Sequence, residues 1–259
     1  MKTKSLGFIG GGRITKIILQ AFENSGISFE KVVVTDTNPD VLTSLKLKFP
    51  KITVTTDNLQ EVVNNEVIFI ALHPPVLMET LVKIKDLMNK DSVLVSLAPK
   101  LTIEKMATAL GGFANISRMN PSASAITNKG VNPIAFSQEM KVETRNEFLE
   151  LMRSLGSTPV VEEPKIEAYA VITAMGHTYF FFQLQKLKEL AVTFGINEKE
   201  AQTAITEMLW GTTETLFKSG LPYAEVADLV PVKPMAEVEE TIKGYYDQYL
   251  TDIFNKIKP

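Results

Sequence analysis

The sequence contains no cysteine. Without cysteine the chain can form neither a disulfide bond nor a cysteine zinc site, and no thiolate nucleophile is available. This composition is typical of proteins in a reducing compartment, so we expect a cytoplasmic location. Only two histidines occur, without the carboxylate and histidine spacing of a metal site, and we therefore predict no bound metal.

Long hydrophobic runs are also missing. The two most apolar stretches, EVIFIAL and SVLVSLA, are each about seven residues long, whereas a helix needs roughly 20 residues to span a bilayer. The N-terminal stretch MKTKSLGFIGG has neither the apolar core nor the cleavage site of a secretion signal. We therefore expect no membrane contact and read both apolar stretches as buried strands.

No strong excess of one charge is present. The 27 basic and 30 acidic residues leave a formal charge of -3, which gives no electrostatic reason to expect nucleic acid or anionic lipid as a partner. A small-molecule substrate is the more natural expectation. The length of 259 residues allows one large or two modest domains, and we expect two.

The first part of the chain, residues 1–163, alternates short β-branched runs with helical patterns. This alternation is typical of a parallel sheet covered by helices on both faces, a doubly wound α/β fold of the Rossmann type. Fully apolar strands fit such a sheet because both of their faces are buried. The expected strands are SLGFI, KVVVTD, KITVTT, EVIFIAL, SVLVSLA, FANISRM, NPIAFS and STPVVEE.

The remaining residues, 164–259, lack strand-like runs and predict an all-α domain. Helices are expected over 166–194, over 198–218 after a cap at Asn197, and over 235–256. The YFFFQL segment places aromatic side chains around its whole helix, so another surface must cover it. We expect a homodimer formed through these helices; a central helix within the subunit's own bundle is the alternative. Trp210 is expected in the core.

A run of glycines connects the first expected strand to the first helix. In a dinucleotide-binding turn, Gly10 would allow the sharp bend, and Gly12 would let backbone N–H groups approach a pyrophosphate at the helix N-terminus. Thr15 stands where a third glycine or alanine is usual, so we expect slightly looser packing there. The alternative is a purely structural turn. The predicted cofactor contacts in this segment are Gly10, Gly11, Gly12, Arg13 and Ile14.

Asp36 follows the second expected strand, where it could accept hydrogen bonds from an adenosine ribose. Its carboxylate would repel a 2′-phosphate and so favours NAD. NADP remains open, because Arg13, Thr35 and Thr37 are near enough to help. The alternative role of Asp36 is a local cap of the Asx type. The expected cofactor is thus NAD or NADP.

Taken in order, the motifs resemble those of the Δ1-pyrroline-5-carboxylate reductases over nearly the whole chain. The resemblance implies an N-terminal Rossmann domain, a C-terminal helical dimerisation domain, and hydride transfer from NAD(P)H to a cyclic imine. It also implies cofactor contacts at Leu72, His73, Pro74, Ala98, Asn120 and Ser122. The segments that carry it are GFIGGGRIT, FIALHPPVLMETL, SLAPKLTIEKM, RMNPSASAITNKGVNPIAF and the stretch from LAVTFG to ADLV.

The segments around the expected substrate site depart from that family. Thr173–Thr178 replaces Ser-Gly-Ser-Gly-Pro-Ala, and Val232–Glu237 replaces Ser-Pro-Gly-Gly-Thr-Thr. We expect His177 to donate a proton, with Thr173 one turn earlier on the same face. The alternative for His177 is a histidine packed within a helix interface. Lys233 is a weaker candidate for contact with a substrate carboxylate.

Two positions near the cofactor also differ, because the family's lysine after the fourth strand is His73 here and its Met-Pro-Asn asparagine is Ser122. The alternative for His73 is an exposed loop residue. These changes lead us to predict an NAD(P)-dependent oxidoreductase that reduces a small imine or carbonyl compound other than pyrroline-5-carboxylate. Two alternatives remain: an authentic pyrroline-5-carboxylate reductase of proline biosynthesis, and a dinucleotide-binding protein without catalysis.

Overall fold

The computed structural model describes residues 4–259, apart from the side chains of Pro74 and Pro75. Its contacts divide the chain into two units: unit 1, formed by residues 1–175 and 253–259, and unit 2, formed by residues 176–252. The unit boundary follows contacts alone, so the functional boundary between residues 163 and 164 stays a prediction. No helix among the described residues has both the length and the apolar character needed to cross a bilayer.

Unit 1 contains a sheet with strand order β3-β2-β1-β4-β5-β6-β8. The first six strands in chain order run parallel, whereas β8 is antiparallel to β6. The strands are β1 (Ser5–Ile9), β2 (Lys31–Thr35), β3 (Thr53–Thr55), β4 (Val67–Ile70), β5 (Val93–Ser96), β6 (Ile116–Met119) and β8 (Ile134–Phe136). This arrangement confirms the predicted Rossmann-type fold, but the expectation of a parallel strand at NPIAFS is wrong.

The expected strand at STPVVEE is also largely wrong. Only β9 (Gly156–Ser157) forms, and it pairs with β7 (Gly130–Val131) in a separate small sheet. Pro159 has no backbone N–H and cannot donate to a strand ladder, so the run continues only as an isolated bridge between Val160 and Ile134.

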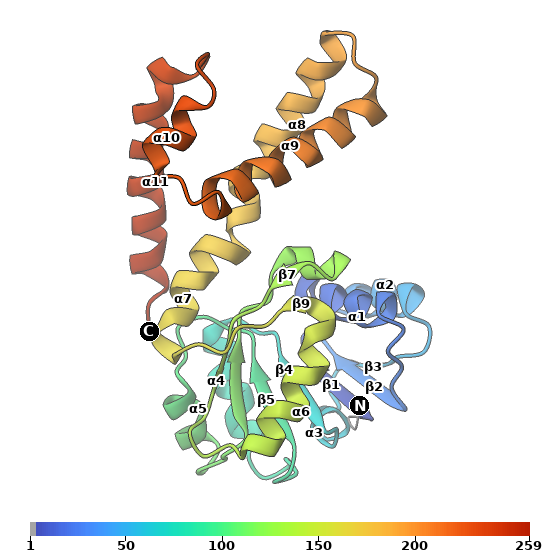
Figure 1. The fold of residues 1–259 in the computed structure, drawn as a ribbon. Coiled ribbons are helices and arrows are strands. Elements are labelled where there is room, and N and C mark those ends of the chain that lie inside the picture. Colours follow the sequence, from blue (N-terminus) through green and yellow to red (C-terminus); the bar gives the residue numbers. More distant parts are fainter. Residues whose placement is uncertain (1–3) are drawn as a thin grey trace. The chain divides into compact units, whose positions relative to one another are not determined.

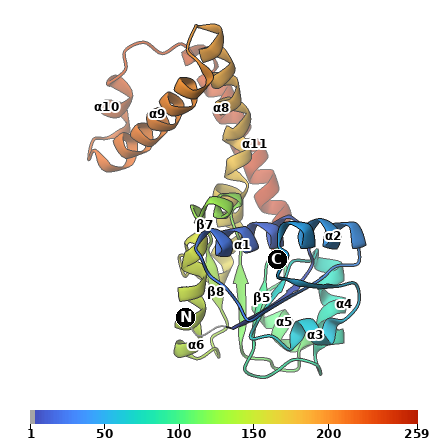
Figure 2. The same ribbon diagram turned by 90° about the vertical axis from the view of Figure 1, so that its right-hand side faces the viewer.

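Helices cover both faces of the main sheet (Figures 1 and 2). The helices α1 (Arg13–Asn24), α2 (Pro39–Lys48) and α6 (Val142–Met152) bury side chains in one core. The helices α3 (Leu59–Val63), α4 (Pro74–Ile84) and α5 (Ile103–Ala109) bury theirs in the other. Neighbouring strand residues point to opposite faces, so Phe8 enters the first core and Ile9 the second.

Short helical turns connect the remaining parts of unit 1. They are η1 (Ala123–Thr127), η2 (Arg153–Leu155), η3 (Glu163–Lys165), α7 (Ile166–Tyr169) and the π-turn η4 (Ala170–Ala174). The long helix expected over 166–194 is therefore interrupted. Met175 N–H bonds to the carbonyl of Ala170, five residues back, at 2.9 Å, which is the widened spacing of a π-turn.

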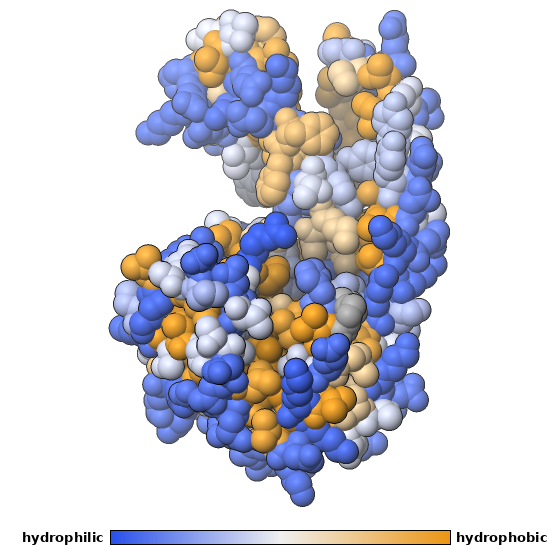
Figure 3. Space-filling model, turned by 180° about the vertical axis from the view of Figure 1, so that it is seen from behind, coloured by the Kyte–Doolittle hydropathy of each residue, from blue (hydrophilic) through white to orange (hydrophobic). Residues whose placement is uncertain are grey.

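Unit 2 is helical, as predicted. Its elements are α8 (Gly176–Thr193), α9 (Glu198–Lys218), α10 (Tyr223–Asp228) and most of α11 (Ala236–Ile257). Asn197 caps α9 as expected, because its side chain accepts the Glu200 N–H at 2.9 Å. The short helix α10 had not been predicted. Hydrophobic side chains reach the surface over much of the molecule (Figure 3).

The expectation that Trp210 lies in the core is wrong, because Trp210 is 70% exposed. It lies on α9, which packs chiefly against α8. The described chain has no further layer over this face of α9, so the apolar pattern that suggested a core instead marks an uncovered surface.

Candidate active site

The glycine turn after β1 is tightly constrained at its first position. Gly10 has a φ of 104°, and a Cβ at that position would lie 2.7 Å from the backbone oxygen of Ala71. The Gly10 N–H donates to the Thr35 carbonyl at 2.7 Å. Only glycine fits both the left-handed backbone and the close approach of the loop after β4.

Thr15 holds the other side of this turn. Its side chain is fully buried, and its hydroxyl donates to the Gly10 carbonyl at 2.5 Å. The expectation of looser packing at Thr15 is therefore wrong. The hydroxyl fills the space beside the turn and gives a buried carbonyl a hydrogen-bond partner.

Gly12 differs from Gly10, because it has ordinary backbone angles and open space around it. It is the N-cap of α1 with a φ of -70° and makes no side-chain cap bond, and a Cβ there would meet nothing within 4 Å. The first N–H groups of a helix have no intrahelical partner and favour a negative charge. This exposed helix start can therefore receive an anion such as a diphosphate. Arg13 beside it is exposed and Ile14 is half-buried.

Asp36, which follows the neighbouring strand β2, fixes the glycine turn through a hydrogen bond. One carboxylate oxygen accepts the Gly11 N–H at 2.8 Å, and the other accepts the Asn38 N–H at 2.9 Å. The second bond is the local Asx-type contact considered as an alternative for Asp36. Each carboxylate oxygen has a further lone pair, so the ribose contact stays a prediction. Thr35 is buried and Thr37 is exposed.

Further predicted contacts lie where β4 and β5 end. Leu72 is half-buried, and His73 is exposed at the N-cap of α4 with no side-chain cap bond. Ala98 is buried beyond the end of β5. The carboxyl ends of parallel strands are where doubly wound proteins bind ligands. Pro74 was also predicted to touch the cofactor, but its side chain lies outside the described part of the chain.

The loop after β6 brings Asn120 and Ser122 to the same edge of the sheet. The Asn120 side-chain nitrogen is buried without a hydrogen-bond partner. The Ser122 N–H donates to the side-chain oxygen of Asn132 at 3.0 Å, and the Ser122 and Ser124 hydroxyls lie 3.0 Å apart. Asn132 is fully buried and fixes the loop, a role that the sequence analysis missed. A polar residue between apolar ones in GVNPIA was the only available signal.

Lys100 is a second residue that the sequence analysis missed. It follows β5 in the segment that resembles Ser-Ile-Ala-Ala-Gly, at the place of the glycine, and it has a φ of 71°. A left-handed backbone is strained for residues other than glycine and asparagine, and such strain concentrates at functional sites. Its side chain is exposed, so a positive charge lies at the carboxyl edge of the parallel strands.

Thr173 lies within the π-turn η4, just before the chain passes into unit 2. Its hydroxyl donates to the Tyr169 carbonyl at 2.8 Å, and the residue is half-buried. Wide turns of this kind often occur at functional sites. The hydroxyl oxygen can still accept a hydrogen bond while it donates to Tyr169.

His177 belongs to unit 2, where its ring stacks on Phe181 with centroids 5.8 Å apart. Both residues lie on α8, so this contact within one helix does not decide the alternative of a histidine packed in a helix interface. The roles of His177 and Thr173 in proton donation, and their position on one face, stay predictions. Val232–Glu237 is exposed, Lys233 included, and substrate contact by Lys233 also stays a prediction.

A groove of about 440 Å³ lies within unit 2, lined by side chains of α8 and α11 and by Met235, the residue before α11. Tyr179 and Tyr246 meet edge to face in it, with centroids 5.9 Å apart. Burial raises the pKa of the Tyr179 phenol above its usual value, and the nearby Tyr246 adds to the effect. The groove is thus an apolar, aromatic surface that is open in the single chain. Its lining includes Phe182, Met235, Ile242, Tyr245, Tyr249 and Leu250.

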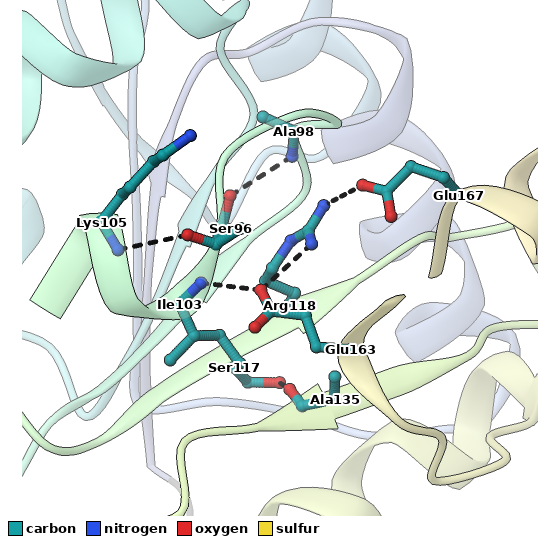
Figure 4. Close-up of polar contacts among 10 residues, drawn as sticks. Ser96, Ala98, Ile103, Lys105, Ser117, Arg118, Ala135, Glu163 and Glu167 are labelled. Carbon is teal, nitrogen blue, oxygen red and sulfur yellow. Dashed lines mark hydrogen bonds and ion pairs between the residues drawn. The ribbon is translucent and has the colours of Figure 1, made fainter. Parts of the chain in front are cut away.

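One buried ionic cluster was not predicted at all. Arg118, on β6, pairs with Glu163 at 3.1 Å and with Glu167 (Figure 4). The Glu163 carboxylate also accepts the N–H of Ile103, the first residue of α5, at 2.7 Å. An arginine near the end of an apolar strand gives little indication in the sequence that it is buried.

Comparison with known proteins supports this description of the N-terminal half. Residues 5–100 match the family described as NADP oxidoreductase coenzyme F420-dependent. The matched range contains the glycine turn, Asp36 and the strand ends through Lys100.

Relatives and solved structures extend the similarity to the whole chain. The chain is 27% identical to pyrroline-5-carboxylate reductase of Escherichia coli K12 over 229 residues, which are 88% of this chain and 84% of the relative. It is 23% identical to the Methanosarcina acetivorans enzyme of that name, over 89% of this chain and 85% of the relative.

The fold also matches the NADP-bound crystal structure of Plasmodium falciparum pyrroline carboxylate reductase, with a TM-score of 0.79 and 17% identity. That match covers 99% of this chain and 95% of the other. Along most of its length the chain is therefore similar in sequence to pyrroline-5-carboxylate reductases, and it shares their two-part fold.

Proposed function

We propose that the protein is an NAD(P)H-dependent reductase that transfers hydride to the C=N bond of a small cyclic imine. The observation that carries the proposal is the unfilled helix start at Gly12, where a side chain would meet nothing within 4 Å. The reductases named among its relatives, and the NADP bound in the Plasmodium falciparum structure, support a nicotinamide cofactor.

The residues of the turn have separate tasks in this proposal. The N–H groups at the start of α1 bind the cofactor diphosphate, and Gly10 and Thr15 keep the turn in shape. Asp36 holds the Gly11 N–H and accepts a ribose hydroxyl. The strand ends, with Ala98, Asn120 and Ser122, orient the nicotinamide end.

The reaction needs little chemistry from the protein itself. The cofactor supplies the hydride when bound, and the chain must hold the imine carbon beside it and keep the imine protonated. We assign orientation to the polar loop at Asn120–Ser122 and proton supply to Thr173 or His177. A carbonyl substrate would depend more heavily on that proton donor.

The substrate proposed first is pyrroline-5-carboxylate, on the strength of the relatives' names. A different anionic imine or keto acid is the second candidate, favoured by Val232–Glu237 in place of the family's glycine and threonine loop and by the cation at Lys100. An assay of both NADH and NADPH with pyrroline-5-carboxylate, and then with other cyclic imines and keto acids, separates the two. Turnover of pyrroline-5-carboxylate rejects the second candidate.

We also propose that the protein acts in the cytoplasm as a homodimer formed through its helical unit. The aromatic groove between α8 and α11 supports this assembly. Apolar surface of this extent on helices is typical of a covered interface rather than of an isolated chain.

The test of cofactor binding replaces Gly12 with alanine. Ordinary backbone angles and empty space predict an unchanged unfolding temperature, whereas the added methyl group should crowd the diphosphate. Crowding of about 1–3 kcal/mol corresponds to a loss of about tenfold to hundredfold in affinity for NADH and NADPH. Calorimetric titration measures the affinity for both cofactors. Gly211→Ala, on an exposed helix and also without a neighbour within 4 Å, is the matched control.

Unchanged affinity in a folded Gly12→Ala protein would reject the proposed diphosphate site. Binding of neither cofactor by the unmodified protein would reject the reductase function altogether. Asp36→Asn tests cofactor choice, because it keeps an acceptor for Gly11 and removes the charge. We expect it to raise affinity for NADPH relative to NADH.

A further inference from the structure

Arg118 is the largest fully buried side chain among the described residues, with 1% of its area exposed. It belongs to β6, which lies between β5 and β8 in the sheet. An arginine at such a depth must give up its hydration, which is costly unless paired charges compensate for it. Its partners therefore explain why it can lie there.

Two glutamates supply the compensation from one segment. Glu163 and Glu167 are four residues apart, in η3 and α7, and each gives its Oε1 to the guanidinium (Figure 4). Because Glu163 also accepts the Ile103 N–H, one cation holds together β6, the start of α5 and the start of α7.

The cluster is not balanced in charge or in hydrogen bonding. It contains two carboxylates for one guanidinium, and both Glu167 Oε2 and Arg118 Nε are buried without a hydrogen-bond partner. Apolar replacements of buried ion pairs are often as stable as the pair or more stable. Folding stability alone therefore gives no reason for this sequence to keep the cluster.

Arg118 and Glu167 each precede, by a few residues in the chain, a segment of the proposed site. One residue after β6 the chain reaches Asn120 and then Ser122, and three residues beyond Glu167 it enters the π-turn that contains Thr173. Both segments lie in unit 1. The pair therefore connects the polar loop to the turn through a single side-chain contact.

We infer that Arg118 and Glu167 form a positioning pair that fixes the π-turn relative to the loop at Asn120–Ser122. The inference rests on the proposed function, which assigns substrate orientation to that loop. Neither residue touches the substrate. The diphosphate turn follows β1, which is separated from β6 by β4 and β5. The pair therefore acts on the alignment of the nicotinamide and the substrate and leaves the diphosphate contacts, on which cofactor affinity depends in this proposal, unchanged.

The test removes the two charges of the Arg118–Glu167 pair together, as Arg118→Met with Glu167→Leu. Glu163, whose side chain is 26% exposed, keeps the hydrogen bond from the Ile103 N–H. Each single change leaves a buried charge without its partner and should lower the unfolding temperature markedly, whereas the double change should restore much of it. In the double variant we expect NADPH affinity within about twofold of the unmodified protein, and kcat with pyrroline-5-carboxylate at least about tenfold lower. Glu162→Gln, which alters an exposed glutamate of the same segment, is the control that should change neither.

A second measurement does not depend on turnover. Amide hydrogen exchange should become faster in residues 119–124 and 170–175 of the folded double variant, with no change around the glycine turn. Unchanged exchange in both segments overturns the inference, as does an unchanged kcat in a variant that binds NADPH. Failure of the double variant to fold would also overturn it, because the cluster would then be required for stability. Loss of the proposed function is recognised separately, as an unmodified protein that binds neither NADH nor NADPH.

Discussion

Unit 1 and unit 2 use apolar residues in opposite ways. In unit 1, helices on both sides of the sheet bury two continuous cores, and Phe8 and Phe69 stack within one of them with centroids 4.8 Å apart. In unit 2, Ala201 and Gly176 are buried, while Phe182, Trp210 and Phe217 are largely exposed. The two units therefore differ in packing: unit 1 buries its large apolar side chains in two cores, whereas unit 2 exposes several of its own.

This difference indicates what each unit needs in order to be stable. Unit 1 contains the partners for its own apolar side chains. Helices in proteins gain most of their stability from packing of an apolar face, and the aromatic faces of α8, α9 and α11 have too few partners within unit 2. Their sequence is therefore suited to a surface supplied from outside the unit, in agreement with the proposed homodimer.

The largest effect is expected when charges are placed on the exposed aromatic surface of unit 2. Phe182→Asp combined with Trp210→Asp should weaken self-association at least about hundredfold, because each buried aromatic contributes roughly 1.5–3 kcal/mol. Sedimentation experiments measure the change in the dissociation constant of the dimer. Leu47→Asp is the control, since Leu47 is 78% exposed in unit 1 and should leave association unchanged. A tight dimer in the double variant would reject this surface as the interface.

The next effect concerns the core of unit 1, at Gly7 in β1. A Cβ at this position would lie 2.2 Å from the backbone oxygen of Val62, so α3 and β1 would have to separate. We expect Gly7→Ala to lower the free energy of unfolding by about 3 kcal/mol, measured by urea denaturation. A loss below about 0.5 kcal/mol would mean that the strand and helix are not in such close contact.

A smaller effect is expected at Thr15, which separates the packing of the turn from its hydrogen bonding. Thr15→Val keeps the shape but removes the donor to the Gly10 carbonyl, at a cost of about 1–2 kcal/mol. Denaturation and NADPH titration should both register the change. Thr15→Ser retains the hydroxyl and should show a smaller loss. Equal losses in the two variants would show that the methyl group matters as much as the hydroxyl.

The smallest effect lies on the surface of unit 2, where Lys188 and Glu198 pair at 2.8 Å. The hydrogen bond from Lys188, reinforced by its charge, holds the pKa of Glu198 below its usual value. The stabilisation is thus present at neutral pH and is lost as the pH falls through the lowered pKa. Glu198→Gln should lower the unfolding temperature slightly at pH 7, with the difference from the unmodified protein vanishing in acid. A difference independent of pH would exclude the ion pair as its cause.

Much of unit 1 was predictable because its signals are local. Its apolar strands and the Gly10 bend depend on residues close together in the chain, and the same holds for the Asn197 cap in unit 2. The antiparallel direction of β8 was missed, although a physical signal exists. A parallel strand needs a crossover, usually helical, and between β6 and β8 the chain offers only the short turn η1 and the two residues of β7.

The unpredicted parts of the site depend on long-range contacts. Arg118 meets Glu163 and Glu167 across sequence separations of 45 and 49 residues, which no local pattern reveals. Lys100 has a left-handed backbone, which lysine disfavours, so its residue type predicts a different conformation from the one observed. Trp210 was misassigned because an apolar residue on a helix indicates that it will be covered, without indicating which chain covers it.

The hydrogen bond from Gly11 to Asp36 limits which substitutions of Asp36 can change coenzyme preference during evolution. A lineage that replaced this carboxylate with a small apolar residue would also lose the hydrogen bond that holds the Gly11 N–H in the glycine turn. Substitutions that keep an acceptor at this position avoid that penalty. Adaptation toward the phosphorylated coenzyme would therefore pass through asparagine or serine more readily than through glycine or alanine.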